Sequence, residues 1–190
     1  AETQAAYRFL SNPRTDWQAL LEPHWANSLE RMRAHQVVLN IQDTTELDFN
    51  ARQTAGLGPL SYEAQRGMYL HPTYVISPER EPLGVLDAWM WAREPKDSHG
   101  HRPGMKESLR WIEGYERVAE RAKALPEVRQ VYVADREADI LALLVKARDL
   151  EYAADYLVRC QHNRALPSGD KLWAKLAQAP VLGSVRFELP

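Results

Sequence analysis

A chain of 190 residues, of which 45% are hydrophobic and 26% charged, is long enough to bury the core of one domain of ordinary size. Its formal net charge of −2 excludes the global positive field that many nucleic-acid-binding domains carry. The single cysteine, Cys160, excludes an internal disulfide and is typical of a reducing compartment. No apolar run approaches the length of a membrane span, so we expect a cytoplasmic protein with no membrane partner.

The first half of the chain predicts a helical segment followed by antiparallel strands. Residues 4–35 repeat apolar side chains at helical spacing. The β-branched stretch 35–49 predicts a first strand, with Val37, Leu39 and Ile41 on one face. Residues 68–79 and 82–94 predict a strand pair closed by a short turn, and a loop containing Gly and Pro precedes this pair.

The second half alternates helices and strands. Helices are predicted over 108–125, 137–150 and 169–179, and strands over 128–135 and 155–163, with the start of a further strand near the last residues. Three antiparallel strands followed by alternating strands and helices predict an α/β fold, with a mixed sheet and flanking helices.

Three carboxylates and an arginine lie at the seam between the 128–135 strand and the helix after it, in the sequence DREAD. Asp135 is the first residue after the apolar strand, at the sheet edge where ligands of open α/β sheets bind. Asp139 is better placed as the N-cap of the helix, and Glu137 is favoured near the positive helix end, although it could also be a reserve metal ligand. Taken alone, the motif has a purely structural explanation.

A second acid, Asp43, lies on the first predicted strand between an apolar half-strand and two threonines, Thr44 and Thr45, which can donate hydrogen bonds to it. Alone, it is explained as a strand-end acid. Carboxylates on two neighbouring strands can share a divalent cation, however, and Mg²⁺ is usually held by one or two carboxylates plus substrate phosphates. Such a site suits phosphoryl transfer.

The two motifs IQDTTELDF and VYVADREADI, about ninety residues apart, resemble the first two catalytic aspartate motifs of the DDE transposases. The resemblance is to the cut-and-paste bacterial insertion-sequence group that includes the transposon-five transposase. The segments AYRFLSNP and YLVRCQHNR are also similar to that group, so the resemblance runs over nearly all of the chain.

The resemblance implies an RNase H-like fold and an enzyme that performs metal-dependent DNA strand cleavage and strand transfer. It implies Asp43 and Asp135 as the catalytic residues that hold Mg²⁺ or Mn²⁺. It implies that Arg159 faces DNA near the cleaved end, where the alternative is a solvent-facing strand residue; His162 and Arg164 are weaker DNA-binding candidates. The implied partners are transposon-end and target DNA, with a homodimer in the full-length synaptic complex.

The family pattern also has a third carboxylate, which belongs to a Glu on a late helix. In that helix motif, two residues separate a Tyr from an Arg, and three residues separate the Arg from the Glu. The nearest match begins at Tyr156 and has Asn163 where Glu is required. In that group, the Glu follows an insertion after the fifth core strand. We therefore expect a helical segment over 1–36 packed on the core, the first five strands over 37–163, and the start of the insertion over 164–190. The sheet would then be incomplete at its C-terminus, and this piece alone would be inactive.

Two alternatives remain open. One is an RNase H-like nuclease that hydrolyses DNA without strand transfer, and the other is a non-catalytic DNA-binding or assembly module.

Several other side chains also have two interpretations each. His99 and His101 could bind metal but are better explained by a loop, and His71 could approach the acidic site or be a buried structural histidine. Trp89 and Trp91 could stack on bases, but they alternate as core residues do.

Overall fold

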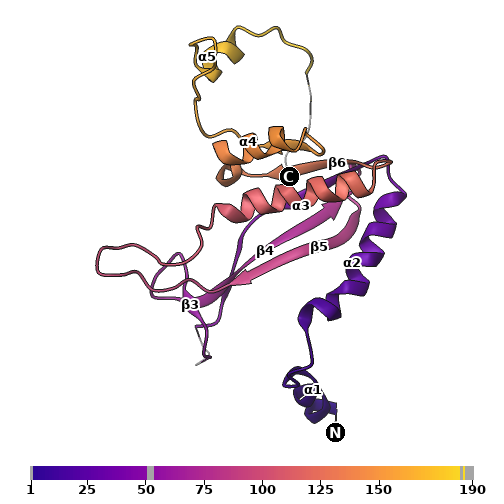
Figure 1. Ribbon diagram of the computed structural model, residues 1–190, viewed down its shortest axis with the longest axis vertical. Coiled ribbons are helices and arrows are strands. Elements are labelled where there is room, and N and C mark those ends of the chain that lie inside the picture. The colour runs from indigo at the N-terminus through magenta and orange to yellow at the C-terminus, as the bar shows by residue number, and fades with distance from the viewer. Residues whose placement is uncertain (1, 51–53, 185, 187–190) are drawn as a thin grey trace. The chain divides into compact units, whose positions relative to one another are not determined.

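The computed structural model describes residues 2–50, 54–184 and 186, and the chain divides into two compact units, residues 1–159 and 160–190. The elements of the first unit follow one another as α1 (Glu2–Leu10), α2 (Trp17–Arg33), β1 (Val37–Gln42), β2 (Thr45–Asp48), β3 (Gly58–Pro59), β4 (Arg66–Ile76), β5 (Pro82–Trp91), α3 (Leu109–Ala124), β6 (Arg129–Ala134), the 3₁₀ turn η1 (Arg136–Ala138), α4 (Leu141–Asp149) and β7 (Asp155–Val158) (Figure 1).

The strands form one mixed sheet in which β5, β4, β1, β6 and β7 lie side by side. β4 is antiparallel to both of its neighbours, β5 and β1, whereas β6 is parallel to β1 and β7 is parallel to β6. The short strands β2 and β3 pair with the first half of β4. The predicted α/β architecture, with a mixed sheet and flanking helices, is thereby confirmed.

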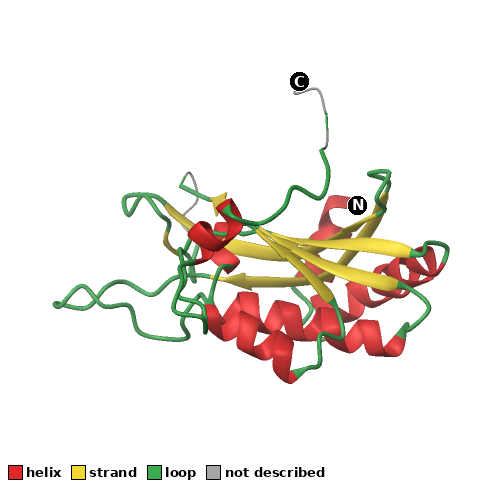
Figure 2. Ribbon diagram, turned by 90° about the horizontal axis from the view of Figure 1, so that it is seen from above, coloured by secondary structure: helices red, strands yellow, loops and turns green. Residues whose placement is uncertain are grey.

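Helices α2, α3 and α4 cover one face of this sheet (Figure 2). The side chains of β1 that are buried on that face are Val38, Asn40 and Gln42, and the residues predicted to share a face, such as Leu39, lie on the opposite, less buried one. One core cluster joins α3, α4 and β6 around Tyr115, and a second joins α2, β4 and β5 around Met32. Burial of this apolar surface fixes the helices on the sheet.

Several boundaries differ from the sequence-based expectation, and one of them is the end of β7, which is at Val158 although the sequence predicts a strand as far as residue 163. The helical stretch is two helices, because the chain turns at 11–16 before Asp16 caps α2 by accepting the Gln18 N–H at 3.1 Å. The first strand is interrupted at Asp43 and Thr44, opposite Pro72 of β4, which cannot donate to a β-ladder.

Another difference concerns the helix after the DREAD seam. This helix begins only at Leu141, and its N-cap residue is Ile140 rather than Asp139, which is buried. The prediction that Asp139 caps the helix was therefore wrong. Asp135 causes the delay, because its side chain first caps the 3₁₀ turn by accepting the Glu137 N–H at 2.7 Å.

The second unit, residues 160–190, contains α5 (Leu172–Ala177) and an isolated bridge between Ala165 and Lys171. The strand expected near the C-terminus falls largely outside the described residues. In the part of the chain that the structure describes, no helix has the length and apolar character needed to cross a lipid bilayer.

Candidate functional site

The carboxyl ends of three parallel strands meet at one edge of the sheet. Gln42, the last residue of β1, is paired with Ala134, the last residue of β6, and Ala134 is paired with Val158 at the end of β7. The next residues along the chain are Asp43, Asp135 and Arg159, respectively. The three residues that the sequence analysis singled out therefore follow register-matched ends of adjacent strands.

Each aspartate shapes the turn in which it lies. The Asp43 carboxylate accepts the N–H of Thr44 at 2.7 Å, and the Asp135 carboxylate accepts the N–H of Glu137 at the same distance. Such local hydrogen bonds compete with the β-ladder and end the strand. The expected hydroxyl donation from Thr44 to Asp43 is replaced by this backbone contact, since the Thr44 hydroxyl contacts His71 instead.

A chain of hydrogen-bonded side chains, most of them buried, supports the turn at Asp43. The His71 ring is fully buried, with Nδ1 2.9 Å from the Thr44 hydroxyl and Nε2 3.3 Å from the Gln42 amide oxygen. The Gln42 amide nitrogen in turn donates to the Thr73 hydroxyl at 2.6 Å. Burial lowers the pKa of His71 to about 4, so the ring is neutral near pH 7. His71 thus acts as a satisfied structural histidine beside the acidic edge.

A pocket of about 270 Å³ lies beside Asp43 and gathers further carboxylates from other parts of the chain. Four acids line it: Asp43, Glu46, Glu107 and Glu137. Burial raises the pKa of the Glu137 carboxyl, and the negative charges of Asp135, Asp43 and Glu107 raise it further. Glu137 is therefore part of the acidic edge as well as part of the 3₁₀ turn.

Sequence reasoning missed Glu107, which lies in the loop before α3 and has no motif around it. Its two carboxylate oxygens accept from the Arg93 guanidinium, whose hydrogen bonds and charge hold the pKa of Glu107 below its usual range. The acidic pocket therefore contains one carboxylate, that of Glu107, in an ion pair with a guanidinium, and three that form no ion pair within the pocket lining. Of these three, Glu46 accepts hydrogen bonds from the Ser61 N–H and the Tyr69 hydroxyl, each at 2.9 Å.

The two loop histidines and the two tryptophans considered as candidates both have structural surroundings that explain them. Asp97 accepts the backbone N–H groups of both His99 and His101, each at 2.9 Å, which is a loop arrangement. Trp89 and Trp91 are half-buried beneath the guanidinium groups of two arginines of α3. Over the described ranges, no group of three or more His, Cys, Asp or Glu side chains is arranged to hold a metal ion.

His162 and Arg164, the weaker DNA-binding candidates, belong to the second unit. There the backbone carbonyl of His162 accepts from the Cys160 thiol, and the carbonyl of Arg164 accepts the Leu172 N–H at 2.9 Å. The structure therefore brings together Asp43, Asp135 and Arg159 in the first unit, but it does not assign His162 and Arg164 to that edge.

No family model matches the sequence of this chain.

Proposed function

We propose that this chain belongs to the catalytic core of a DDE transposase, with an RNase H-like fold, and that it takes part in metal-dependent cleavage and transfer of DNA strands. The observation that carries the proposal is the placement of Asp43 and Asp135. Each directly follows the paired last residues of two adjacent parallel strands, Gln42 and Ala134, although the motifs are about ninety residues apart in the sequence. The sheet order supports the RNase H-like part of the proposal, because the antiparallel strands β1, β4 and β5, with the short strands β2 and β3 paired to β4, are followed by β6 and β7, which are parallel to β1.

The donor set at this edge fits Mg²⁺ or Mn²⁺. Two carboxylates offer hard oxygen ligands, and such ions are commonly held by one or two carboxylates together with substrate phosphates. Asp43 and Asp135 are the residues that would hold the ion. When bound, a divalent metal supplies activation of the attacking hydroxyl and stabilisation of the leaving oxygen.

The chain's own residues have definable roles around that chemistry. Asp43 and Asp135 directly follow the paired ends of two strands, and the contact between the His71 ring and the Thr44 hydroxyl holds the turn at Asp43 in place. Arg159 offers a positive charge at the end of the third parallel strand, where its backbone N–H donates to the Ala134 carbonyl at 3.2 Å. In this proposal its guanidinium contacts a phosphate of DNA bound at this edge.

Paramagnetic Mn²⁺ tests the proposal directly. Titration into the 190-residue chain, with and without an oligonucleotide, should broaden the amide NMR signals around Asp43 and Asp135. Asp135→Asn should abolish that broadening. Asp155→Asn is the matched control, since Asp155 is an exposed acid at the other end of a parallel strand and should leave the effect intact. Broadening that survives in Asp135→Asn, or that centres elsewhere, would refute the metal site.

A non-catalytic DNA-binding or assembly module is the second candidate. The observation that favours it is that no three-ligand group is found among the described residues. Mn²⁺ binding that depends on Asp135 would argue against this candidate. A nuclease without strand transfer is distinguished by its products, because it yields nicked DNA and no joined DNA.

A further inference from the structure

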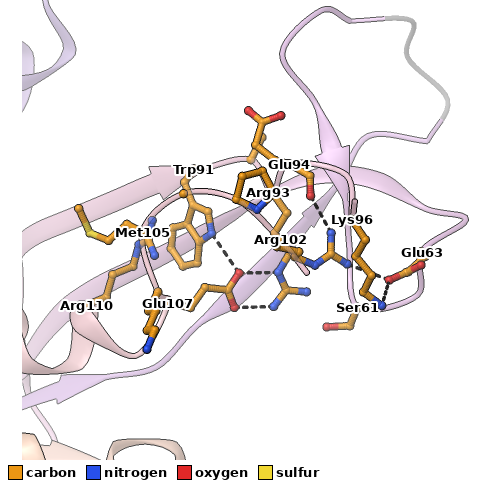
Figure 3. A pocket seen from close by; sticks show the side chains of 14 residues that line it. Ser61, Glu63, Trp91, Arg93, Glu94, Lys96, Arg102, Met105, Glu107 and Arg110 are labelled. Carbon is orange, nitrogen blue, oxygen red and sulfur yellow. Dashed lines mark hydrogen bonds and ion pairs between the residues drawn. The ribbon is translucent and has the colours of Figure 1, made fainter. Parts of the chain in front are cut away.

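A second pocket, of about 630 Å³, adjoins the acidic one. It lies between the end of β5, the loop 92–108 and the start of α3 (Figure 3). The two pockets share four lining residues: Ser61, Trp91, Arg93 and Glu107. Its charge is opposite in sign, because its lining carries five Lys and Arg side chains against three Glu. A polyanion that reaches the acidic edge therefore meets a positive surface next to it.

Most of these charges are paired within the pocket wall. Arg93 pairs with Glu107, and Lys96 and Arg102 share Glu63. Figure 3 shows these pairs as dashed lines, with the carboxylate of Glu94 directed away from them.

Two positively charged side chains in the lining of this pocket, those of Lys106 and Arg110, differ from the others because they form no ion pair with any residue that the structure describes. Among the described residues, neither Lys106 nor Arg110 has a carboxylate within ion-pair distance. Lys106 is exposed. These are the two positive charges that remain available to a ligand.

The guanidinium of Arg110 stacks on the ring of Trp91. The guanidinium carbon lies 3.6 Å from the centroid of the Trp91 ring, and Trp91 stacks on Tyr69 with centroids 5.2 Å apart. The Nη1 atom of Arg110 is buried and has no hydrogen-bond partner among the described residues. A guanidinium that is oriented by stacking and still lacks an acceptor is suited to a phosphate, which guanidinium donors match in geometry.

We propose that this pocket binds the phosphodiester backbone of a single DNA strand next to the reacting phosphate, with Arg110 and Lys106 as the phosphate contacts. The inference rests on the proposed function, since it assumes that the reacting phosphate lies at the acidic edge. A positive groove with an aromatic wall is the arrangement by which proteins bind single strands without reading their sequence. Residues shared by the two pockets make the path from one to the other continuous.

Binding of a short fluorescein-labelled oligonucleotide, measured by anisotropy over a range of salt concentrations in EDTA, tests the inference. Lys106→Gln and Arg110→Gln should each weaken binding about three- to tenfold, and each should lower the slope of log K against log salt by about 0.7, the value for one phosphate contact to a single strand. Lys123→Gln is the matched control, because Lys123 is an exposed lysine on the last turn of α3, outside the pocket, and should change neither quantity.

Arg110→Gln also removes a ring contact, so its circular dichroism and melting temperature must match those of the unmodified chain. Lys106→Gln removes an exposed side chain and tests the pocket without that complication. Unchanged salt slopes in both variants, no binding of the oligonucleotide at all, or equal affinity for inorganic phosphate would overturn the inference. EDTA removes divalent ions, so binding in this pocket is measured independently of the metal site, and a failure of the pocket is distinguishable from a failure of the Mn²⁺ experiment.

Discussion

Acidification should destabilise this protein through His71, because folding buries the imidazole in its neutral form. The ring is 0% exposed, both of its nitrogens have partners, and burial lowers its pKa from 6.5 to about 4. Between those two values the unfolded chain takes up a proton that the folded chain does not. The free energy of unfolding therefore falls as the pH falls through this window. Linkage gives a loss of about 2 kcal/mol between about pH 7 and about pH 5, and about 3 kcal/mol by about pH 4.

Urea unfolding, followed by circular dichroism at several pH values, measures this loss. The carboxylates of the protein also titrate, so the useful quantity is the difference between the unmodified chain and His71→Gln. This variant should be less stable near neutral pH, and its stability should fall less steeply on acidification. His99→Gln, which changes an exposed loop residue, should follow the unmodified chain. Equal pH slopes for the unmodified chain and His71→Gln, at unchanged m-values, would refute the assignment of a buried neutral ring.

Three further results are expected. Gly114→Ala should lower the free energy of unfolding by about 1–3 kcal/mol, because an added Cβ would lie 2.1 Å from the Gln42 amide oxygen where α3 meets β1; an unchanged melting temperature would contradict this contact. Leu143→Ala should cost about 2–5 kcal/mol in urea unfolding, since the side chain is 0% exposed in the core under α4, and a loss below 1 kcal/mol would show that the site collapses or is loosely packed. Arg159→Ala should weaken DNA binding with little sequence preference and reduce the salt slope by about one phosphate contact, whereas unchanged binding and slope would leave Arg159 as an ordinary surface residue.

The two aspartates could be located from the sequence because strand ends are a local property. The apolar residues of β1 end at Ile41, one residue before the strand ends at Gln42, and those of β6 end at Ala134; an aspartate follows the last residue of each strand. Local hydrogen bonding then fixes the turn that holds each carboxylate. The sequence places the helix after β6 too early, because Asp135 caps a separate 3₁₀ turn over Arg136–Ala138 and the α-helix begins only at Leu141, with Ile140 as its N-cap.

The amino-acid sequence by itself determined the order and type of the main helices and strands, and the positions of Asp43 and Asp135 at strand ends, since these follow from apolar periodicity and turn chemistry. Only the tertiary structure decided that β1 pairs with β6 so that both strands end level, that Arg159 follows the third strand at the same edge, and that Glu107 and Glu137 approach Asp43. Strand pairing and register depend on hydrogen bonds and burial between segments far apart in the chain, and no local pattern specifies which distant side chains will then be neighbours.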